Sequence, residues 1–458
     1  MLIILTLFYW KKILFAIGVT ANTTGKLTSQ HGLFYSYLIK NFGKNTAISY
    51  LRSNENAIYA IKDIIDKEHI NCDFEWQDSF VYTNSKEKLQ EIKLEVEALN
   101  SIGFNAFFSD SVHLPFLTLG SICFPKQAQF HPYKYCISLA NLLSSSIYEN
   151  SKVIGVNKSK GGYNVICENG KFVNCNYVVI ASHYPIINFP GFYFLKMYQD
   201  KSYLIAIDTK ENLFPGMYIS AEEPITSFRS VIFQDKRLLL LGGSGHKTGD
   251  TNFDITSCFA NLENYAKKLY PNCEIVYRWS TEDCVTLDKI PYIGEFSNLL
   301  PNIFVATGFK KWGMTSSFVA AKIICDKILC KQNTDAFVYK ATRFSPIKNS
   351  CETFNMLKQT GFSLVVNKIK HPILSFDNLR VGEGGIVSYN GRKVGIYRKS
   401  ENETIAVKPY CTHLGCELSW NSLEKTWDCP CHGSRYDYTG KLLTEPSKKN
   451  LESVNLEL

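Results

Sequence analysis

Hydrophobic and polar residues alternate along this chain with two different periods. Tyr50 to Glu68 and Ser85 to Leu99 carry apolar residues at helical spacing among charged ones, which predicts two amphipathic helices. A shorter helix is predicted from Leu33 to Phe42, after a loop rich in small and hydroxyl residues. Between the helices, Cys72 to Thr83 alternates in the manner of a strand. This part of the chain therefore predicts a mixture of helices and strands.

Continuous apolar runs follow, two of which contain β-branched residues. Tyr177 to Ala181, Arg237 to Leu241 and Ile303 to Ala306 each predict a strand buried on both faces of a parallel sheet. The segment from Ser151 to Ala181 predicts short strands joined by a Gly-Gly and an Asn-Gly turn. Gly308 to Lys327 predicts a glycine turn that leads into a helix. Strands mixed with helices in this way indicate an α/β fold.

The pattern changes again in the last third of the chain. Residues 336–371 have little periodicity and carry Pro346, so we expect a linker there. In residues 372–458, short apolar stretches are separated by closely spaced Gly and Asn turns, which predicts a small all-β domain. A chain of 458 residues is long enough for more than one domain. We therefore expect a larger domain at 1–335, then the linker and the all-β domain.

Composition and charge narrow the function classes. The net charge of +8 is spread along the chain without a dense Lys/Arg run, so nucleic acid is not an expected partner. Met1 to Trp10 is apolar, but Lys11 and Lys12 end the run too early for a membrane span, and we expect a buried strand instead. Eleven of the 15 cysteines are scattered singly between Cys72 and Cys351, which is typical of free thiols in a reducing cytoplasm.

Cysteine and histidine residues gather near the C-terminus. Cys411 and His413 form a C-x-H pair, and Cys429 and His432 form a C-x-x-H pair. Two thiolates and two neutral imidazoles at this spacing suit a [2Fe–2S] cluster with one iron held by Cys and the other by His, and the imidazoles raise its potential. A zinc site is the alternative, but four-coordinate zinc fits six candidate ligands in this order poorly. We therefore predict an iron–sulfur cluster.

The neighbours of these pairs add detail to the site. Cys416 and Cys431 remain, one in each segment. They either form a disulfide or stay as free thiols, and we favour the disulfide because both loops must close over one cluster. A glycine in each loop allows a tight turn. Ser434 and Tyr436 follow the second loop, where hydrogen bonds from their hydroxyls to cluster sulfurs would raise the potential further.

Residues 411–436 closely resemble the Rieske motif, C-x-H-x(15)-C-x-x-H. The form CTHLGC…CPCHGS is similar to the Rieske subunits of quinol-oxidising cytochrome complexes, whereas the Rieske domains of ring-hydroxylating dioxygenases lack the extra cysteine pair. The resemblance covers the predicted all-β domain. It implies three pairs, which are Cys411 and Cys429 on one iron, His413 and His432 on the other, and Cys416 and Cys431 in a disulfide.

Residues 20–330 resemble the D-amino-acid oxidase and sarcosine dehydrogenase group of FAD-dependent oxidoreductases, and bacterial members with a C-terminal Rieske domain look closest. The likeness rests on TGKLTSQHG at Thr24 to Gly32, YVVIAS at Tyr177 to Ser182, PYIGEF at Pro291 to Phe296 and FVATGFKKWGMTSS at Phe304 to Ser317. It implies FAD as cofactor, a small-molecule substrate, and an α+β substrate domain interleaved with a Rossmann-like FAD domain. The residues that it places beside FAD are Thr24, Gly25, Lys26, Ala181, Ser182, Gly308, Gly313, Met314 and Thr315.

One departure from this group concerns the start of the FAD domain. Members open with a strand, a G-x-G-x-x-G turn and a helix, which let the FAD pyrophosphate reach a helix N-terminus. No such fingerprint precedes Thr20, and residues 1–19 have the length of one other strand and contain no Asp or Glu. We therefore expect an incomplete FAD-binding domain that lacks its first βα unit. The predicted fold class is α/β plus all-β.

These features predict an oxidoreductase that passes electrons between a flavin-oxidised substrate, an amine or amino acid, and a Rieske cluster. The further electron donor or acceptor is unknown. Two alternatives are an iron–sulfur electron-transfer protein whose truncated flavin domain no longer binds FAD, and a membrane Rieske subunit, against which the lack of a predicted membrane span counts. No catalytic residue is predicted. The candidates in the flavin-like segments each suit a packed or surface position as well: His31, His183, Arg229, His246 and Trp312.

Overall fold

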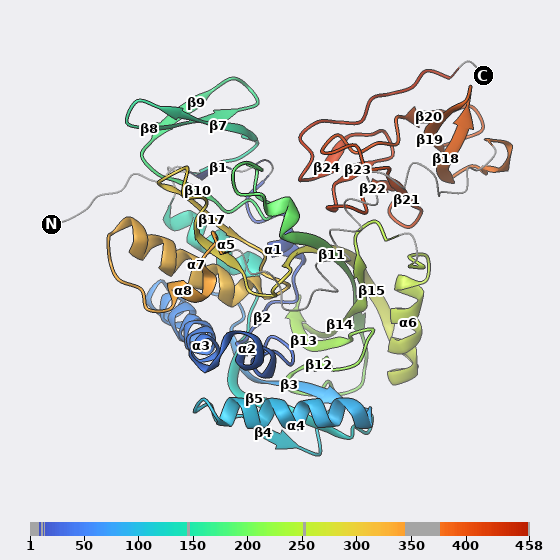
Figure 1. Ribbon diagram of the computed structural model, residues 1–458. Helices are drawn as coiled ribbons and strands as arrows, with labels where there is room; N and C mark the ends of the chain where they lie inside the picture. Colours follow the sequence, from blue (N-terminus) through green and yellow to red (C-terminus); the bar gives the residue numbers. More distant parts are fainter. Residues whose placement is uncertain are drawn as a thin grey trace.

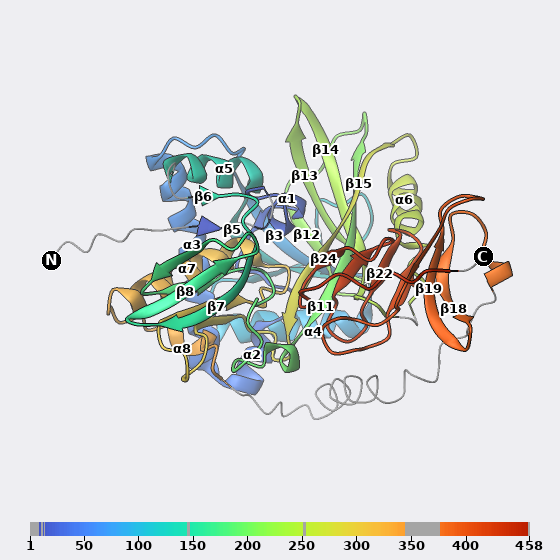
Figure 2. The same cartoon turned by 90° about the horizontal axis from the view of Figure 1, so that it is seen from above.

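The computed structural model describes residues 9–10, 12, 14–143, 147–250, 253–343 and 376–456. These residues form two domains that lie side by side, a first domain up to residue 343 and a smaller C-terminal domain from residue 376 (Figures 1 and 2). Of the strand expected at Met1 to Trp10, only Tyr9–Trp10 falls within the described residues, as strand β1. Among all the helices described, none is long and apolar enough to cross a membrane.

A nine-stranded mixed sheet is the largest element of the first domain. The predicted parallel strand at Arg237 to Leu241 is wrong, because this run lies in β14, antiparallel to both its neighbours. The run is apolar because helix α6 (Cys258–Leu269) packs over Leu239 and Leu241. Only β12 and β3 are parallel neighbours in this sheet. Across the sheet the strands are β15 (Glu274–Thr286), β11 (Met197–Asp208), β14 (Lys236–Lys247), β13 (Ser227–Phe233), β12 (Met217–Ser220), β3 (Glu75–Thr83), β5 (Gly120–Gln129) and β2 (Lys26–Leu27), with β4 (Phe107–Ser109) also on β5.

A second, smaller sheet contains the predicted parallel strands. β10 (Val178–Ile180) runs parallel to β17 (Ile303–Thr307), and β16 (Tyr292–Glu295) pairs antiparallel with β17. β17 is buried along its whole length, as its apolar run predicts. β10 is an edge strand in which Val179 is 45% exposed, so the prediction of burial on both faces is wrong there.

Two further small sheets accompany this one. β7 (Val153–Ser159), β8 (Gly162–Cys167) and β9 (Phe172–Cys175) form the antiparallel strands that the turn signals predict. β1 pairs in parallel with β6 (Ile147–Tyr148). The parallel strands of the first domain are therefore divided among several sheets.

The helices of the first domain pack mainly on one core. α2 (Tyr35–Phe42) and α3 (Lys44–Lys67) are separated at Gly43, whose φ of 87° breaks the helix. α8 (Ala336–Tyr339) lies at the start of the expected linker, but Tyr339 is buried in this core, so that part of the chain packs on the first domain. Residues 344–371 of the expected linker lie outside the described residues. The other helices are α1 (Val19–Asn22), α4 (Lys86–Asn100), α5 (Pro132–Leu142), α7 (Gly313–Ile328) and the 3₁₀ turn η1 (Tyr193–Leu195).

The C-terminal domain is all-β apart from the 3₁₀ turn η2 (Phe376–Asn378), as its turn pattern predicts. Two small antiparallel sheets build it. Trp427 is fully buried and leaves no room for a side chain at Gly395, because a Cβ there would lie 2.9 Å from the Trp427 ring. The strands are β18 (Gly384–Tyr389), β19 (Arg392–Arg398) and β20 (Thr404–Val407) in one sheet, and β21 (Ser419–Asn421), β22 (Thr426–Asp428), β23 (Arg435–Asp437) and β24 (Leu442–Thr444) in the other.

Candidate metal centre and its interface

Two tight loops of the C-terminal domain carry the predicted ligands. In the first loop the Gly415 N–H donates to the Cys411 carbonyl at 2.8 Å, and in the second the Gly433 N–H donates to the Cys429 carbonyl at 2.9 Å. Both glycines have a positive φ, of 78° and 79°, which a residue with a side chain rarely adopts. The loops therefore turn at the glycines, as the sequence predicts.

These loops bring the four predicted ligands to one place. Cys411, Cys429 and His432 are buried, and the rings of His413 and His432 lie 5.1 Å apart at an angle of 88°. Cys416 and Cys431 form the expected disulfide between the loops. The Cys429 sulfur lies within 4.8 Å of both disulfide sulfurs. Because sulfurs in a disulfide are not thiolates, they are unsuited to bind a metal, and the two thiols and two imidazoles remain as the donor set.

The buried nitrogens of the two histidines fit this donor set. Nδ1 of His413 and both ring nitrogens of His432 are buried and have no hydrogen-bond partner among the described residues. Burial lowers the pKa of His413 to about 4 and that of His432 to about 3, so both rings are neutral at pH 7. A neutral imidazole with an unpartnered, buried nitrogen is a ready metal ligand. The site therefore fits a group that binds two imidazoles.

The two thiols are equally suited to the cluster. The hydrogen bond with Cys429 lowers the pKa of Cys411 to about 5, against the effect of burial, and raises that of Cys429. The Cys411 sulfur also lies 3.2 Å from the Ser447 hydroxyl and 3.5 Å from the Tyr436 hydroxyl. Ser434, the other predicted donor, accepts the Ser447 N–H at 3.0 Å. Ser447 was not predicted, because no motif links it to the two loops.

The imidazole edge of this site packs against the first domain. The Asn188 side-chain amide hydrogen-bonds Nε2 of His413 at 3.1 Å. The Phe194 ring meets both imidazoles edge to face, with ring centroids 5.8 Å from His413 and 5.9 Å from His432. Since Asn188 occupies Nε2 of His413, only Nδ1 of that ring is open to a metal. Neither first-domain residue was predicted, because both lie in a segment without a recognisable motif.

Close contacts to the backbone of the second loop also hold the two domains together beside this site. The Gln199 side-chain amide donates to the carbonyls of His432, at 3.1 Å, and Glu445, at 2.7 Å. A Cβ on Gly433 would lie 2.6 Å from the Gln199 side chain. A Cβ on Gly249 would lie 2.6 Å from the Pro430 nitrogen. A side chain at either glycine would therefore push the second loop away from the first domain.

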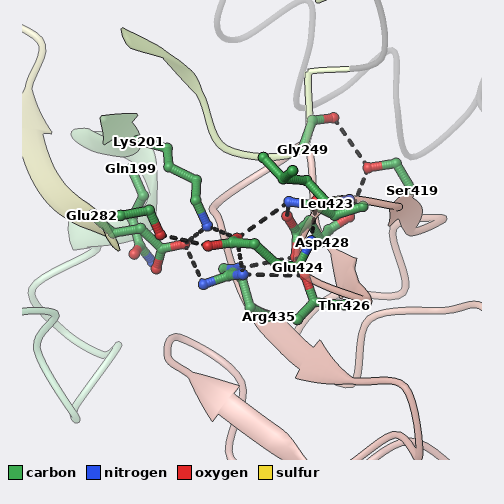
Figure 3. A network of polar contacts seen from close by, with 12 residues as sticks. Gln199, Lys201, Gly249, Glu282, Ser419, Leu423, Glu424, Thr426, Asp428 and Arg435 are labelled. Atoms are coloured by element: carbon green, nitrogen blue, oxygen red, sulfur yellow. Dashed lines mark hydrogen bonds and ion pairs between the residues drawn. The ribbon is translucent and has the colours of Figure 1, made fainter. Parts of the chain in front are cut away.

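A buried ionic network also joins the domains (Figure 3). Lys201 and Glu282 of the first domain meet Glu424 and Arg435 of the C-terminal domain. Arg435 lies 3.0 Å from Glu282 and 3.0 Å from Asp428. Burial opposes the charged carboxylates, but Arg435 and Lys201 outweigh it and hold the pKa values of Glu424 and Asp428 below their ordinary values. The cations of this network therefore keep both carboxylates ionised.

The residues expected beside FAD fall into two groups. The first group lies at the carboxyl ends of β10 and β17, where Ile180 pairs with Val305. Ala181 and Ser182 follow β10, and Gly308 follows β17. Helix α7 begins nearby in the chain at Gly313, and within the described part of the chain no side chain caps its N-terminus. The carboxyl edge of parallel strands next to an uncapped helix N-terminus fits a phosphate-bearing cofactor such as FAD.

The second group is engaged in contacts within the first domain. The Lys26 ammonium donates to the Tyr218 carbonyl at 2.8 Å and to the Ser227 hydroxyl at 2.6 Å. A Cβ on Gly25 would lie 2.4 Å from the Phe130 carbonyl oxygen, so this glycine serves close packing. Thr24 adjoins Gly25 in sequence. The contacts of Gly25 and Lys26 give no support to an assignment of this segment to FAD.

Thr315 and Met314 complete the second group. The Thr315 hydroxyl is buried and donates to the Thr28 carbonyl at 3.4 Å. Met314 packs against the core that contains Leu27. His31 stacks on Trp312 with ring centroids 4.7 Å apart, and burial lowers its pKa to about 3. His31 and Trp312 are therefore packed residues, which is one of the positions predicted for them from the sequence.

Fold and site together define a two-domain redox protein, with a cysteine–histidine metal centre docked on an α/β domain. The family model for the FAD dependent oxidoreductases (DAO) matches residues 12–327, and the model for the Rieske [2Fe-2S] domain matches residues 370–455. The chain belongs to the FAD-dependent oxidoreductase family and carries a C-terminal Rieske domain. The two family assignments confirm the predicted cofactor classes, a [2Fe–2S] cluster and FAD.

Known proteins resemble both parts. The Rieske 2Fe-2S iron-sulfur protein YhfW of Bacillus subtilis (strain 168) is 35% identical over 443 residues, which are 96% of this chain and 87% of that protein. The cytochrome b6-f complex iron-sulfur subunit 1 of Nostoc is 51% identical over 45 residues, 10% of this chain and 25% of that protein.

Among solved structures, glycine oxidase from Geobacillus kaustophilus is similar with a TM-score of 0.61 and 18% identity, over 73% of this chain and 91% of that one. L-proline dehydrogenase from P. horikoshii is similar with a TM-score of 0.58 and 15% identity, over 72% of this chain and 88% of that one. At these identities the likeness shows the fold, and it confirms the predicted α/β domain of the D-amino-acid oxidase type.

Proposed function

We propose that this protein is an oxidoreductase in which the first domain and the Rieske cluster exchange electrons within one chain. The observation that carries the proposal is the docking of the imidazole edge on the first domain. Phe194 contacts both imidazoles, and Asn188 hydrogen-bonds His413. These contacts place the cluster ligands against the domain that would hold the flavin.

Within this proposal the chain's own residues have distinct tasks. Cys411 and Cys429 would hold one iron, and His413 and His432 the other. The Cys416–Cys431 disulfide fixes the two loops. The Tyr436 hydroxyl donates to the Ser447 hydroxyl, which lies 3.2 Å from the Cys411 sulfur. FAD supplies two-electron oxidation of the substrate when bound. Because the cluster carries one electron at a time, the electrons must reach an external partner singly.

The substrate is proposed to be an amine or amino acid. The support is the fold shared with glycine oxidase and L-proline dehydrogenase, together with the sequence resemblance to the same group. We place the protein in the cytoplasm. The cysteines with free thiols, Cys325 and Cys330 on the surface among them, suit a reducing compartment.

The proposal is tested on the purified full chain. We expect acid-released flavin, and a Rieske-type EPR signal after reduction with dithionite. A panel of amino acids should then reduce the cluster under anaerobic conditions in the parent protein. In the matched Cys411→Ser variant they should reduce only the flavin. A dithionite-reduced parent without the EPR signal would contradict the cluster assignment.

A second candidate is an iron–sulfur electron-transfer protein that binds no FAD. It is favoured by the internal contacts of Lys26, which lies in a segment expected beside FAD. The flavin measurement separates the two candidates. A full Rieske signal without any released flavin would support the second.

A further inference from the structure

Two exposed phenylalanines lie next to the candidate cluster, on the segment between β10 and β11. Phe189 is 61% exposed and Phe192 is 41% exposed, and their ring centroids lie 5.1 Å apart. Phe194, which is buried, lies 5.8 Å from Phe189 and 6.2 Å from Phe192. A single exposed apolar residue needs no explanation, but two in ring contact that continue into a buried third form a patch. We call Phe189 and Phe192 the aromatic patch.

The aromatic patch leads directly to the cluster ligands. Phe194, its buried neighbour, contacts the rings of both His413 and His432. On the other side, His413 is only partly buried, and Leu414 beside it is 39% exposed. The exposed rings of the patch are therefore joined to the imidazoles by two successive ring contacts, from the patch to Phe194 and from Phe194 to the histidines.

The charges at this surface are positive. Lys448 and Lys449 are exposed, and the Lys449 carbonyl accepts a hydrogen bond from the Thr412 hydroxyl at 2.8 Å, which places the pair beside the first loop. Neither ammonium forms an ion pair with a carboxylate of the described residues. A partner with an acidic rim would supply the carboxylates that pair with these two ammonium groups.

We propose that the aromatic patch, together with Leu414, Lys448 and Lys449, is the docking surface for a small acidic one-electron carrier protein. The inference rests on the proposed cluster and deepens the proposed function by naming its electron partner. The apolar centre and cationic rim are the anatomy of a transient protein interface. A quinol would need an accessible imidazole nitrogen, but Asn188 occupies Nε2 of His413 and His432 is buried. The step is the transfer of one electron between the carrier and the cluster, and no bond forms or breaks.

The test uses stopped-flow reduction of the oxidised full chain by a reduced plant-type [2Fe–2S] ferredoxin. This acidic protein has a potential well below the Rieske range, so the transfer is downhill. We expect a second-order rate that falls with rising salt and drops about tenfold in the Phe189→Ser/Phe192→Ser variant. The Lys448→Gln/Lys449→Gln variant should also be slower and less sensitive to salt. The control variant Phe172→Ser/Phe337→Ser, which changes exposed phenylalanines elsewhere, should match the parent.

Reduction by dithionite, a small reductant, distinguishes a loss of docking from damage to the cluster itself. Dithionite should reduce the cluster of all four proteins at the same rate, with the same EPR signal. Equal ferredoxin rates in the parent and the Phe189→Ser/Phe192→Ser variant would overturn the proposal, as would an equal loss of rate with dithionite. A parent without a Rieske signal would instead overturn the proposed function, so the two failures are distinguishable.

Discussion

The hydroxyls of Tyr436 and Ser447 converge on one sulfur, that of Cys411, and also on each other at 2.5 Å. The sequence predicted Tyr436 from its place just after the second loop. It could not predict Ser447, because a turn of the chain after β24 returns this residue to the site without any motif to mark it. At the scale of single residues, spacing therefore selects the candidate ligands, while the hydroxyls around them depend on the tertiary fold.

Loss of one of these hydroxyls should lower the reduction potential of the cluster. Hydrogen bonds to sulfur stabilise the reduced, more negative state, so Tyr436→Phe and Ser447→Ala each remove part of that stabilisation. A hydrogen bond to a charged group worth about 1.5 kcal/mol corresponds to roughly 60 mV for one electron. An EPR-monitored potentiometric titration measures the shift, and Tyr438→Phe is the matched control. Potentials equal to that of the parent would show that the hydroxyls do not act on the cluster.

The two loops that carry the candidate ligands were predictable as elements because each turn is local, with its glycine and its candidate ligands within a few residues. Longer apolar runs were less informative. The run at Arg237 to Leu241 is the same whether a buried strand is parallel or antiparallel, and only its pairing with β11 and β13 decides the question. The run at Tyr177 to Ala181 does not show that β10 is an edge strand. Apolar patterns thus predicted where strands lie but not their neighbours.

Removal of the disulfide should destabilise the C-terminal domain. Cys416 and Cys431 are 15 residues apart, and a loop of this length contributes about 3 kcal/mol in the chain-entropy description. We expect the Cys416→Ser/Cys431→Ser variant to lose stability by that order in chemical denaturation. The variant Cys325→Ser/Cys330→Ser, which changes two exposed free thiols, is the control. Unchanged stability of the disulfide variant would contradict a structural role for the bond.

At the scale of the whole molecule, the interface depends on residues far apart in the chain. Lys201 and Glu282 meet Glu424 and Arg435 (Figure 3). Asn188 meets His413 at the cluster edge. Lysines, arginines and carboxylates of this kind occur throughout the sequence, so composition gives no signal that these will be buried together. The sequence predicted two domains and two cofactor classes but not how the domains dock.

Arg435 is the most connected member of the ionic network. It pairs with Glu282, Glu424 and Asp428. Its loss would leave two buried carboxylates and the partly buried Glu424 without their main cation. We expect Arg435→Met to cost about 3 to 5 kcal/mol in the free energy of unfolding. Lys236→Met breaks an exposed pair with Asp208 and should cost far less than Arg435→Met. A similar small effect of both substitutions would show that the network does not stabilise the docked state.

Acid should weaken the same interface. The pKa values of Glu424 and Asp428 are lowered in the folded protein, so their contribution to stability is present above the unfolded-state pKa and is lost as the pH falls through the folded-state values. The loss should therefore appear below about pH 4. Chemical denaturation at a series of pH values measures it. Arg435→Met should show a shallower dependence, and an identical dependence in both proteins would argue against these carboxylates as its cause.

The most direct test of electron exchange between the docked domains is flash photoreduction of the protein-bound flavin, followed by the absorbance of the cluster. Because the imidazole edge contacts the first domain through Phe194 and Asn188, we expect cluster reduction to be first order, with a rate that does not change on dilution. A rate proportional to protein concentration, or a flavin that stays reduced beside an oxidised cluster, would contradict electron exchange between the two domains of one chain.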